Sequence, residues 1–81
     1  MSRPERRLDL GSGSRERPGF IGLDRFRLPG VQVLANLDAP HLPFADDSFD
    51  LILAFHSVEH AADAMSLMRE IWRVGRAGAQ I

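Results

Sequence analysis

The 81-residue sequence predicts an α/β fold, with a mainly parallel sheet of about four strands and one main helix over residues 64–74. Three observations support this prediction. Short apolar segments of strand length recur between polar turns, one longer segment has apolar residues at helical spacing, and a Gly-x-Gly turn directly follows the first strand-like segment. A chain of this length forms at most one small domain, so residues 1–81 are treated as a single unit.

The first predicted strand covers residues 7–10 and ends at a glycine-rich turn. Asp9 is an acid within this otherwise apolar strand, and Gly11 and Gly13 permit backbone conformations that other residues avoid. This combination suggests a nucleotide-type ligand at the carboxyl end of the sheet. Residues 14–19 are polar and contain a Pro-Gly pair, so we expect no long helix before the second strand.

Three further strands are predicted over residues 20–24, 31–35 and 49–55. The strand over residues 20–24, the second of the chain, ends in an acid, Asp24. The segment 49–55 is almost continuously apolar, which is typical of a central parallel strand covered on both faces.

The predicted helix begins after Asp63, a good N-cap residue, and ends before Gly75. One face, with Trp72 beside it, is expected to form the core: Ala64, Leu67, Met68, Ile71 and Val74. The opposite side is expected to be solvated: Ser66, Arg69, Glu70 and Arg73. A fifth strand is expected to start only near residue 79.

Composition excludes several classes of partner and site. The formal net charge of −1 gives no reason to expect nucleic acid or an anionic membrane, and the absence of cysteine excludes disulfides and thiolate metal sites. The spacing of His41, His56 and His60 matches no metal-ligand pattern, so no metal is expected. No apolar run is long enough to cross a bilayer, which favours a soluble, cytoplasmic domain.

Three segments, taken in order, carry a family resemblance. The segment LDLGSG (residues 8–13) resembles the first motif of class I S-adenosylmethionine-dependent methyltransferases. The segment LPFADDSFDLI (residues 42–52) resembles the LPF-x-D-x-SFD stretch that leads into their fourth strand. The segments SVEH (57–60) and MREIWRV (68–74) are similar to the LEH and REIxRV motifs that follow. A compact branch of this family, in which PGF-x-x-x-D replaces the first long helix, matches residues 18–24 best.

The resemblance implies a Rossmann-like methyltransferase sheet with S-adenosyl-L-methionine as cofactor. It implies four positions at the methionine end of the cofactor: Asp9, Gly11, Gly13 and the backbone around Ser12. By the same resemblance Asp24 accepts hydrogen bonds from the ribose hydroxyls, and Asp38 takes the adenine amino group with help from the main chain at Ala39. His56 is implied to lie near the sulfonium and the methyl acceptor.

Each of these acids also has an ordinary structural explanation, and both explanations stay open here. Asp9 would cap the glycine loop, whereas Asp24 and Asp38 would form turns. Methyl transfer from a sulfonium depends mainly on alignment of the acceptor, and a base is needed only for a protonated acceptor. His56 and His60 are the candidates for such a base.

The sequence departs from the family pattern near its end. GRAGA (residues 75–79) stands in place of LKPGG, and the sequence stops at Ile81, where the fifth strand is expected to start. We therefore expect a partial, C-terminally truncated methyltransferase domain with an exposed sheet edge, which would associate with a second copy or a partner chain. Independent catalysis on an acceptor is not expected without that partner. A degenerate, non-catalytic nucleoside-binding or protein-interaction module, and half of a nicotinamide-binding oxidoreductase, are the alternatives.

Overall fold

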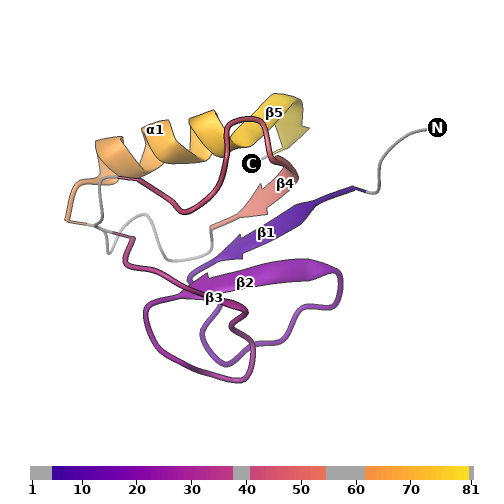
Figure 1. The fold of residues 1–81 in the computed structure, drawn as a ribbon, viewed down its shortest axis with the longest axis vertical. Coiled ribbons are helices and arrows are strands. Elements are labelled where there is room, and N and C mark those ends of the chain that lie inside the picture. Colours follow the sequence, from indigo (N-terminus) through magenta and orange to yellow (C-terminus); the bar gives the residue numbers. More distant parts are fainter. Residues whose placement is uncertain (1–4, 38–40, 55–61, 81) are drawn as a thin grey trace.

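The computed structural model describes residues 5–37, 41–54 and 62–80. Five strands form one sheet in the spatial order β3-β2-β1-β4-β5, and every neighbouring pair is parallel (Figure 1). The strands are β1 (Arg7–Leu10), β2 (Phe20–Asp24), β3 (Val33–Leu34), β4 (Phe49–Leu53) and β5 (Gly75–Gln80), and the helix is α1 (Ala64–Val74). The α/β fold with a parallel sheet is confirmed.

The observed bounds of the elements agree in part with those predicted from the sequence. The bounds predicted for β1, β2 and α1 are confirmed, whereas β3 keeps only two of its five predicted residues and β4 ends at Leu53. The predicted late start of the fifth strand is wrong. Gly75, the residue that caps α1, already has extended backbone angles (φ −79°, ψ 135°) and pairs with Phe49 of β4. The helix therefore leads directly into β5, and β5 rather than β4 lies at that edge of the sheet.

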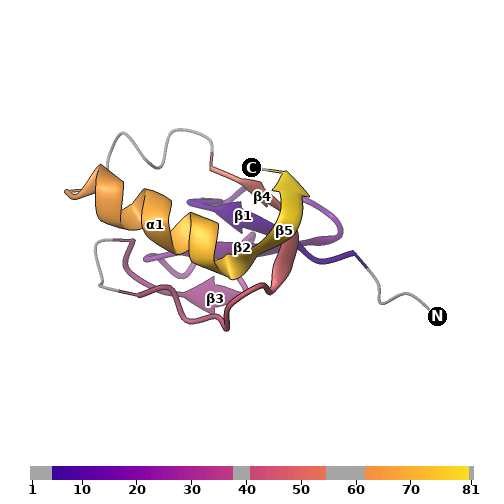
Figure 2. The ribbon, with the colours of Figure 1, turned by 90° about the horizontal axis from the view of Figure 1, so that it is seen from above.

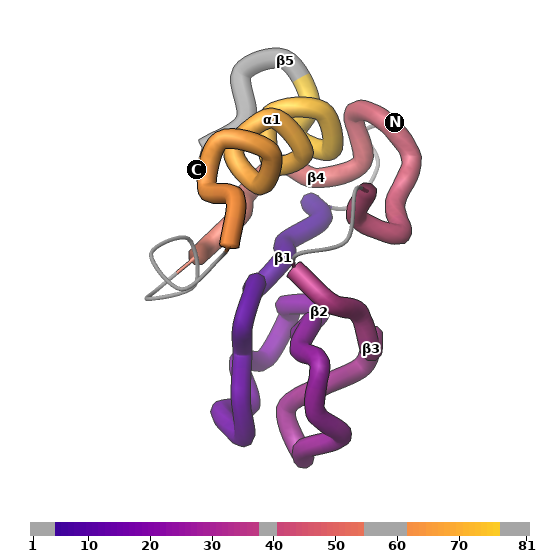
Figure 3. Tube along the Cα trace, turned by 90° about the vertical axis from the view of Figure 1, so that its left-hand side faces the viewer, coloured from indigo at the N-terminus to yellow at the C-terminus, as the bar shows by residue number. Residues whose placement is uncertain are grey.

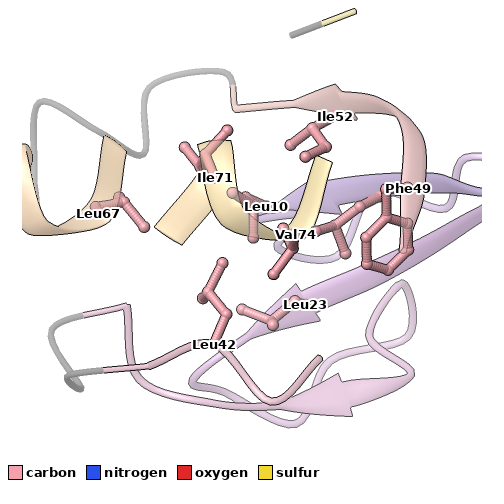
Figure 4. Packing of buried hydrophobic residues seen from close by; sticks show 9 residues of the cluster. Leu10, Leu23, Leu42, Phe49, Ile52, Leu67, Ile71 and Val74 are labelled. Atoms are coloured by element: carbon pink, nitrogen blue, oxygen red, sulfur yellow. The ribbon is translucent and has the colours of Figure 1, made fainter. Parts of the chain in front are cut away.

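Helix α1 covers one face of the sheet (Figure 2). Side chains alternate between the faces of a strand, and neighbouring strands in register present the same face. Leu8 and Leu10 of β1, in register with Ile52 and Leu23 respectively, form the inner layer of the core. The facing layer comes from the helix: Leu67, Ile71 and Val74 (Figure 4). Each such side chain contributes about 1.5–3 kcal/mol when fully buried, so this face supplies most of the hydrophobic stabilisation.

The prediction for the helix faces is wrong at four residues: Ala64, Met68 and Trp72 are exposed, and Glu70 is buried. Met68 is 43% exposed and Trp72 is 79% exposed, so they lie outside the core together with Met65. Glu70, expected in solvent, is only 8% exposed. The helix face toward the sheet is therefore rotated relative to the prediction. Its buried residues are Leu67, Glu70, Ile71 and Val74.

Glu70 is tolerated inside because Arg73 and the segment before β4 satisfy its carboxylate. Oε1 accepts hydrogen bonds from the Leu42 amide (2.7 Å) and from Arg73 Nη2 (2.8 Å), and Oε2 accepts one from Arg73 Nε (2.9 Å). Arg73 also donates to the carbonyls of Leu42 and Phe44 and to the carboxylate of Asp46. These contacts, called here the helix clamp, fasten the segment before β4 to α1.

The opposite face of the sheet is covered by connections instead of a helix. As predicted, no helix follows β1. A methyl group on Gly22 would collide with the carbonyl oxygen of Gly30, and one on Gly30 would collide with the backbone of Arg15. Glycine at both positions therefore lets the connections after β1 and β2 stack on β2. Figure 3 shows them on the side of the molecule away from α1.

Among the described residues, no helix is long and apolar enough to span a membrane.

Candidate functional site

The glycine turn after β1 lies beside the carboxyl end of β2. Leu10 and Leu23 are in register, and the amides of Gly11 and Ser12 donate to the Leu23 carbonyl at 2.8 and 3.2 Å. Gly11 and Gly13 have φ values of 66° and 59°, in the left-handed region that only glycine adopts readily. Glycine is therefore favoured at both positions of this turn whether or not a ligand binds.

Asp24 joins the end of β2 to the turn. Its Oδ2 accepts a hydrogen bond from the Gly13 amide at 2.9 Å, and its Oδ1 accepts from the amides of Arg25 (2.7 Å) and Phe26 (3.4 Å). A carboxylate offers about four lone-pair sites, so roughly one is left for a donor from a ligand. Asp24 is only partly buried, and a methyl group on Gly13 would meet nothing within 4 Å, so this corner is open.

Ser12 contributes its backbone to the turn and its side chain to the fold. The side chain is buried, and its hydroxyl donates to the Gly30 carbonyl at 3.3 Å. This contact ties the turn to the connection that follows β2.

Asp9 lies elsewhere. Its side chain projects from β1 to the face opposite α1, beside Gly22 of β2, and it is 1% exposed. Oδ1 lies 3.5 Å from Arg15 Nη2, and Oδ2 lies 3.4 Å from Arg17 Nε. The structure thus brings Gly11, Gly13 and Asp24 together at one corner and places Asp9 beneath the loop that follows them.

Four predicted site residues lie outside the described residues: Asp38, Ala39, His56 and His60. In the described segments, no group of three or more His, Cys, Asp or Glu side chains could hold a metal ion.

Sequence reasoning missed the roles of Arg15 and Arg17. The signal was present, since an acid within an apolar strand needs a cation when it is buried, and these two arginines follow six and eight residues later. It also missed that Gly22 and Gly30 are sites of close backbone approach.

Comparison with known proteins decides the family. The model of the family described as methyltransferase domain matches residues 17–81, which include Asp24, α1 and β5 but not the glycine turn. The chain belongs to the class I methyltransferase family.

Three similar proteins illustrate this membership. Methyltransferase GfsG of Streptomyces halstedii is 42% identical over 64 residues, which cover 75% of this chain and 23% of that protein. Demethylmenaquinone methyltransferase of Roseiflexus sp. (strain RS-1) is 46% identical over 44 residues, covering 54% of this chain and 18% of that protein. The crystal structure of YcgJ protein from Bacillus subtilis superposes with a TM-score of 0.69 at 26% identity, covering 89% of this chain and 40% of that chain. This methyltransferase-family chain therefore spans less than a quarter of the length of these two curated relatives.

Proposed function

We propose that this chain binds S-adenosyl-L-methionine at the corner formed by the glycine turn and Asp24, as the cofactor-binding part of a methyltransferase. The observation that carries the proposal is the 2.9 Å hydrogen bond from the Gly13 amide to Asp24, which sets an acid at the carboxyl end of β2 beside an open turn. In open parallel α/β sheets, ligands bind at the carboxyl ends of the strands, near the point where the strand order reverses. Here the order reverses between β1 and β4.

The residues present fit this cofactor. The ribose of an adenosyl group carries two hydroxyl donors, and Asp24 has acceptor capacity left after its three backbone contacts. The corner has no helix behind it to present amides to a phosphate, which matches a ligand that has no phosphate. When bound, the cofactor supplies a methyl group on a sulfonium that is already activated for transfer.

The chain's own contribution is binding and orientation. Asp24 would hold the ribose, and the backbone of the Gly11–Gly13 turn would allow close approach of the rest of the cofactor. Alignment of an acceptor then accounts for most of the rate of such a transfer. The names of the relatives point to unlike acceptors. One relative is a demethylmenaquinone methyltransferase, and another is ajmaline N-methyltransferase of Rauvolfia serpentina, so the names favour no acceptor for this chain.

Calorimetric titration with S-adenosylmethionine, S-adenosylhomocysteine and NAD tests the proposal. We expect both adenosyl ligands to bind and NAD not to bind. Asp24→Asn should weaken S-adenosylhomocysteine by about 10- to 100-fold, because charge-assisted hydrogen bonds contribute roughly 1.5–3 kcal/mol.

The matched control is Glu5→Gln, which changes an exposed acid near the amino end of β1, at the opposite end of the strand from the turn. It should leave the affinity unchanged. Preference for NAD would overturn the assignment. A folded sample that binds none of the three ligands would favour the non-catalytic interaction module.

A further inference from the structure

The carboxylate of Asp9 sits under the loop that follows the glycine turn, and not at the open corner. It is 1% exposed, and both of its oxygens face arginines. We propose that Asp9 is a positioning residue, which fixes the glycine turn through Arg15 and Arg17 and does not itself touch the cofactor. This inference rests on the proposed function for its binding readout, but not for its structural one.

The arrangement closes a ring of contacts around the turn. The chain leaves β1 after Asp9, passes through Gly11 and Gly13, and returns with Arg15 and Arg17 to the same carboxylate. Since a buried carboxylate is costly unless it is paired, the segment after the turn is drawn back over β1.

Both arginines are also fixed by other parts of the fold. The guanidinium of Arg17 lies over the ring of Phe20 at 5.6 Å from its centroid, at the start of β2. The backbone of Arg15 packs directly against Gly30, and its amide donates to the Ser12 carbonyl at 3.2 Å. Each arginine therefore links Asp9 to a second element, and the turn between them has few conformations left.

The geometry separates Asp9 from a ligand at the corner. Asp24 and Gly13 border open space, whereas Asp9 is enclosed between β1 and its arginines. This differs from the role that the resemblance implies for Asp9, at the methionine end of the cofactor. It also explains how the turn holds its shape without a helix after it.

The test uses the full chain, with two readouts on each variant. One is the affinity for S-adenosylhomocysteine and for adenosine, which lacks the methionine end. The other is the set of ¹⁵N–¹H resonances of the Gly11 and Gly13 amides, which report the folded turn and are not shifted by a change in global stability. Glu70→Gln is the matched control for the resonances, because it removes a buried acid paired with an arginine away from the turn.

We expect Asp9→Asn to shift both glycine resonances and to weaken the two ligands by the same factor, about tenfold. Glu70→Gln should leave these resonances in place. Replacing the whole cluster with apolar residues (Asp9→Leu, Arg15→Met and Arg17→Leu together) removes the buried carboxylate along with its two partners. Such replacements are often neutral or stabilising, so the triple variant should recover most of the affinity.

Arg15→Gln keeps the test decisive should the triple variant fail to fold, because Arg15 is about half exposed at its side chain (47%). It should shift the glycine resonances and weaken both ligands. Unmoved resonances in Arg15→Gln and Asp9→Asn would overturn the proposal. So would a folded triple variant that binds neither ligand, or an Asp9→Asn variant that loses S-adenosylhomocysteine but keeps adenosine. If the wild-type chain binds neither ligand, the proposed function fails, whereas the resonances still decide the role of Asp9.

Discussion

Two buried acids in this chain are paired with arginine in different ways. In the helix clamp, Glu70 meets both Nε and Nη2 of Arg73 at 2.9 and 2.8 Å, within a single helix. Asp9 instead shares its two oxygens between Arg15 and Arg17, from a loop, at 3.5 and 3.4 Å. Short, forked hydrogen bonds are strong and geometrically specific, whereas contacts near 3.5 Å are weak as hydrogen bonds.

The two ion pairs differ in what they stabilise: the Glu70 pair stabilises the core packing, and the Asp9 pair stabilises a loop at the candidate site. The helix clamp joins two elements that pack on the core, and a change in its geometry would disturb that packing. The Asp9 contacts hold the loop that follows the glycine turn, beside an open corner. Three predictions test this contrast, from the largest expected effect to the smallest.

Removal of the Glu70 carboxylate should have the largest effect. Glu70→Ala leaves Arg73 and the Leu42 amide without their shared acceptor, so we expect a loss of about 3 kcal/mol or more in the free energy of unfolding. Asp9→Ala should cost less, about 1–2 kcal/mol, because the contacts it removes, at 3.5 and 3.4 Å, are longer and weaker than those of Glu70. Urea titration followed by circular dichroism measures both. Arg69→Gln, on the exposed side of the same helix, is the control and should change stability by less than about 0.5 kcal/mol. Equal losses for the two acids would remove the distinction between them.

Acid should weaken the helix clamp next. Hydrogen bonds from Arg73, opposed by burial, lower the pKa of Glu70 from 4.5 to about 2. A carboxyl whose pKa is lower in the folded state stabilises the protein above its unfolded pKa, and this stabilisation is lost as the pH falls. We therefore expect stability to drop between about pH 4.5 and pH 2, by up to about 3 kcal/mol from this residue. Denaturant unfolding at several pH values would measure it.

The matched variant for this pH profile is Glu70→Gln, in which the drop should be much smaller. A remainder is expected from Asp63, because hydrogen bonds from Ser66 also lower the pKa of that carboxyl. A profile identical to that of the wild type would show that Glu70 is not the titrating group.

Local signals predicted part of this fold, and long-range pairing decided the rest. The bounds of β1, β2 and α1 follow from nearby turn and capping residues. Examples are the turn before Phe20 and the N-cap residue Asp63, whose carboxylate accepts a hydrogen bond from the Ser66 amide. The start of β5 was predicted too late because it depends on pairing between Gly75 and the distant Phe49, which no local pattern encodes. In the sequence, Gly75 indicated only the end of the helix.

Local sequence signals likewise predicted only part of the helix face and of the candidate site, and long-range contacts decided the rest. Helix α1 has apolar residues on two sides, so periodicity alone could not say that Met68 and Trp72 point away from the sheet. Glu70 was assigned to solvent because its burial depends on Leu42, which lies 28 residues away. At the corner, the glycine turn was predicted from its place after the first strand and the role of Asp24 from the family resemblance, and the structure brings the two into contact. Asp9 was assigned to the same site by the family resemblance, whereas its carboxylate lies beside Arg15 and Arg17.

The smallest expected effect concerns the shape of the arginine. Lysine keeps the charge but lacks the planar fork, so Arg73→Lys cannot reproduce hydrogen bonds to both Glu70 oxygens. We expect Arg73→Lys to lower the free energy of unfolding by about 1–2 kcal/mol. Arg17→Lys should change it by less than about 1 kcal/mol, because the 3.4 Å contact to Asp9 depends on charge more than on orientation. Thermal and urea unfolding of the two variants side by side measures the difference. A larger loss for Arg17→Lys would contradict this expectation. It would mean that the contact between the Arg17 guanidinium and the Phe20 ring stabilises the protein as strongly as the helix clamp does.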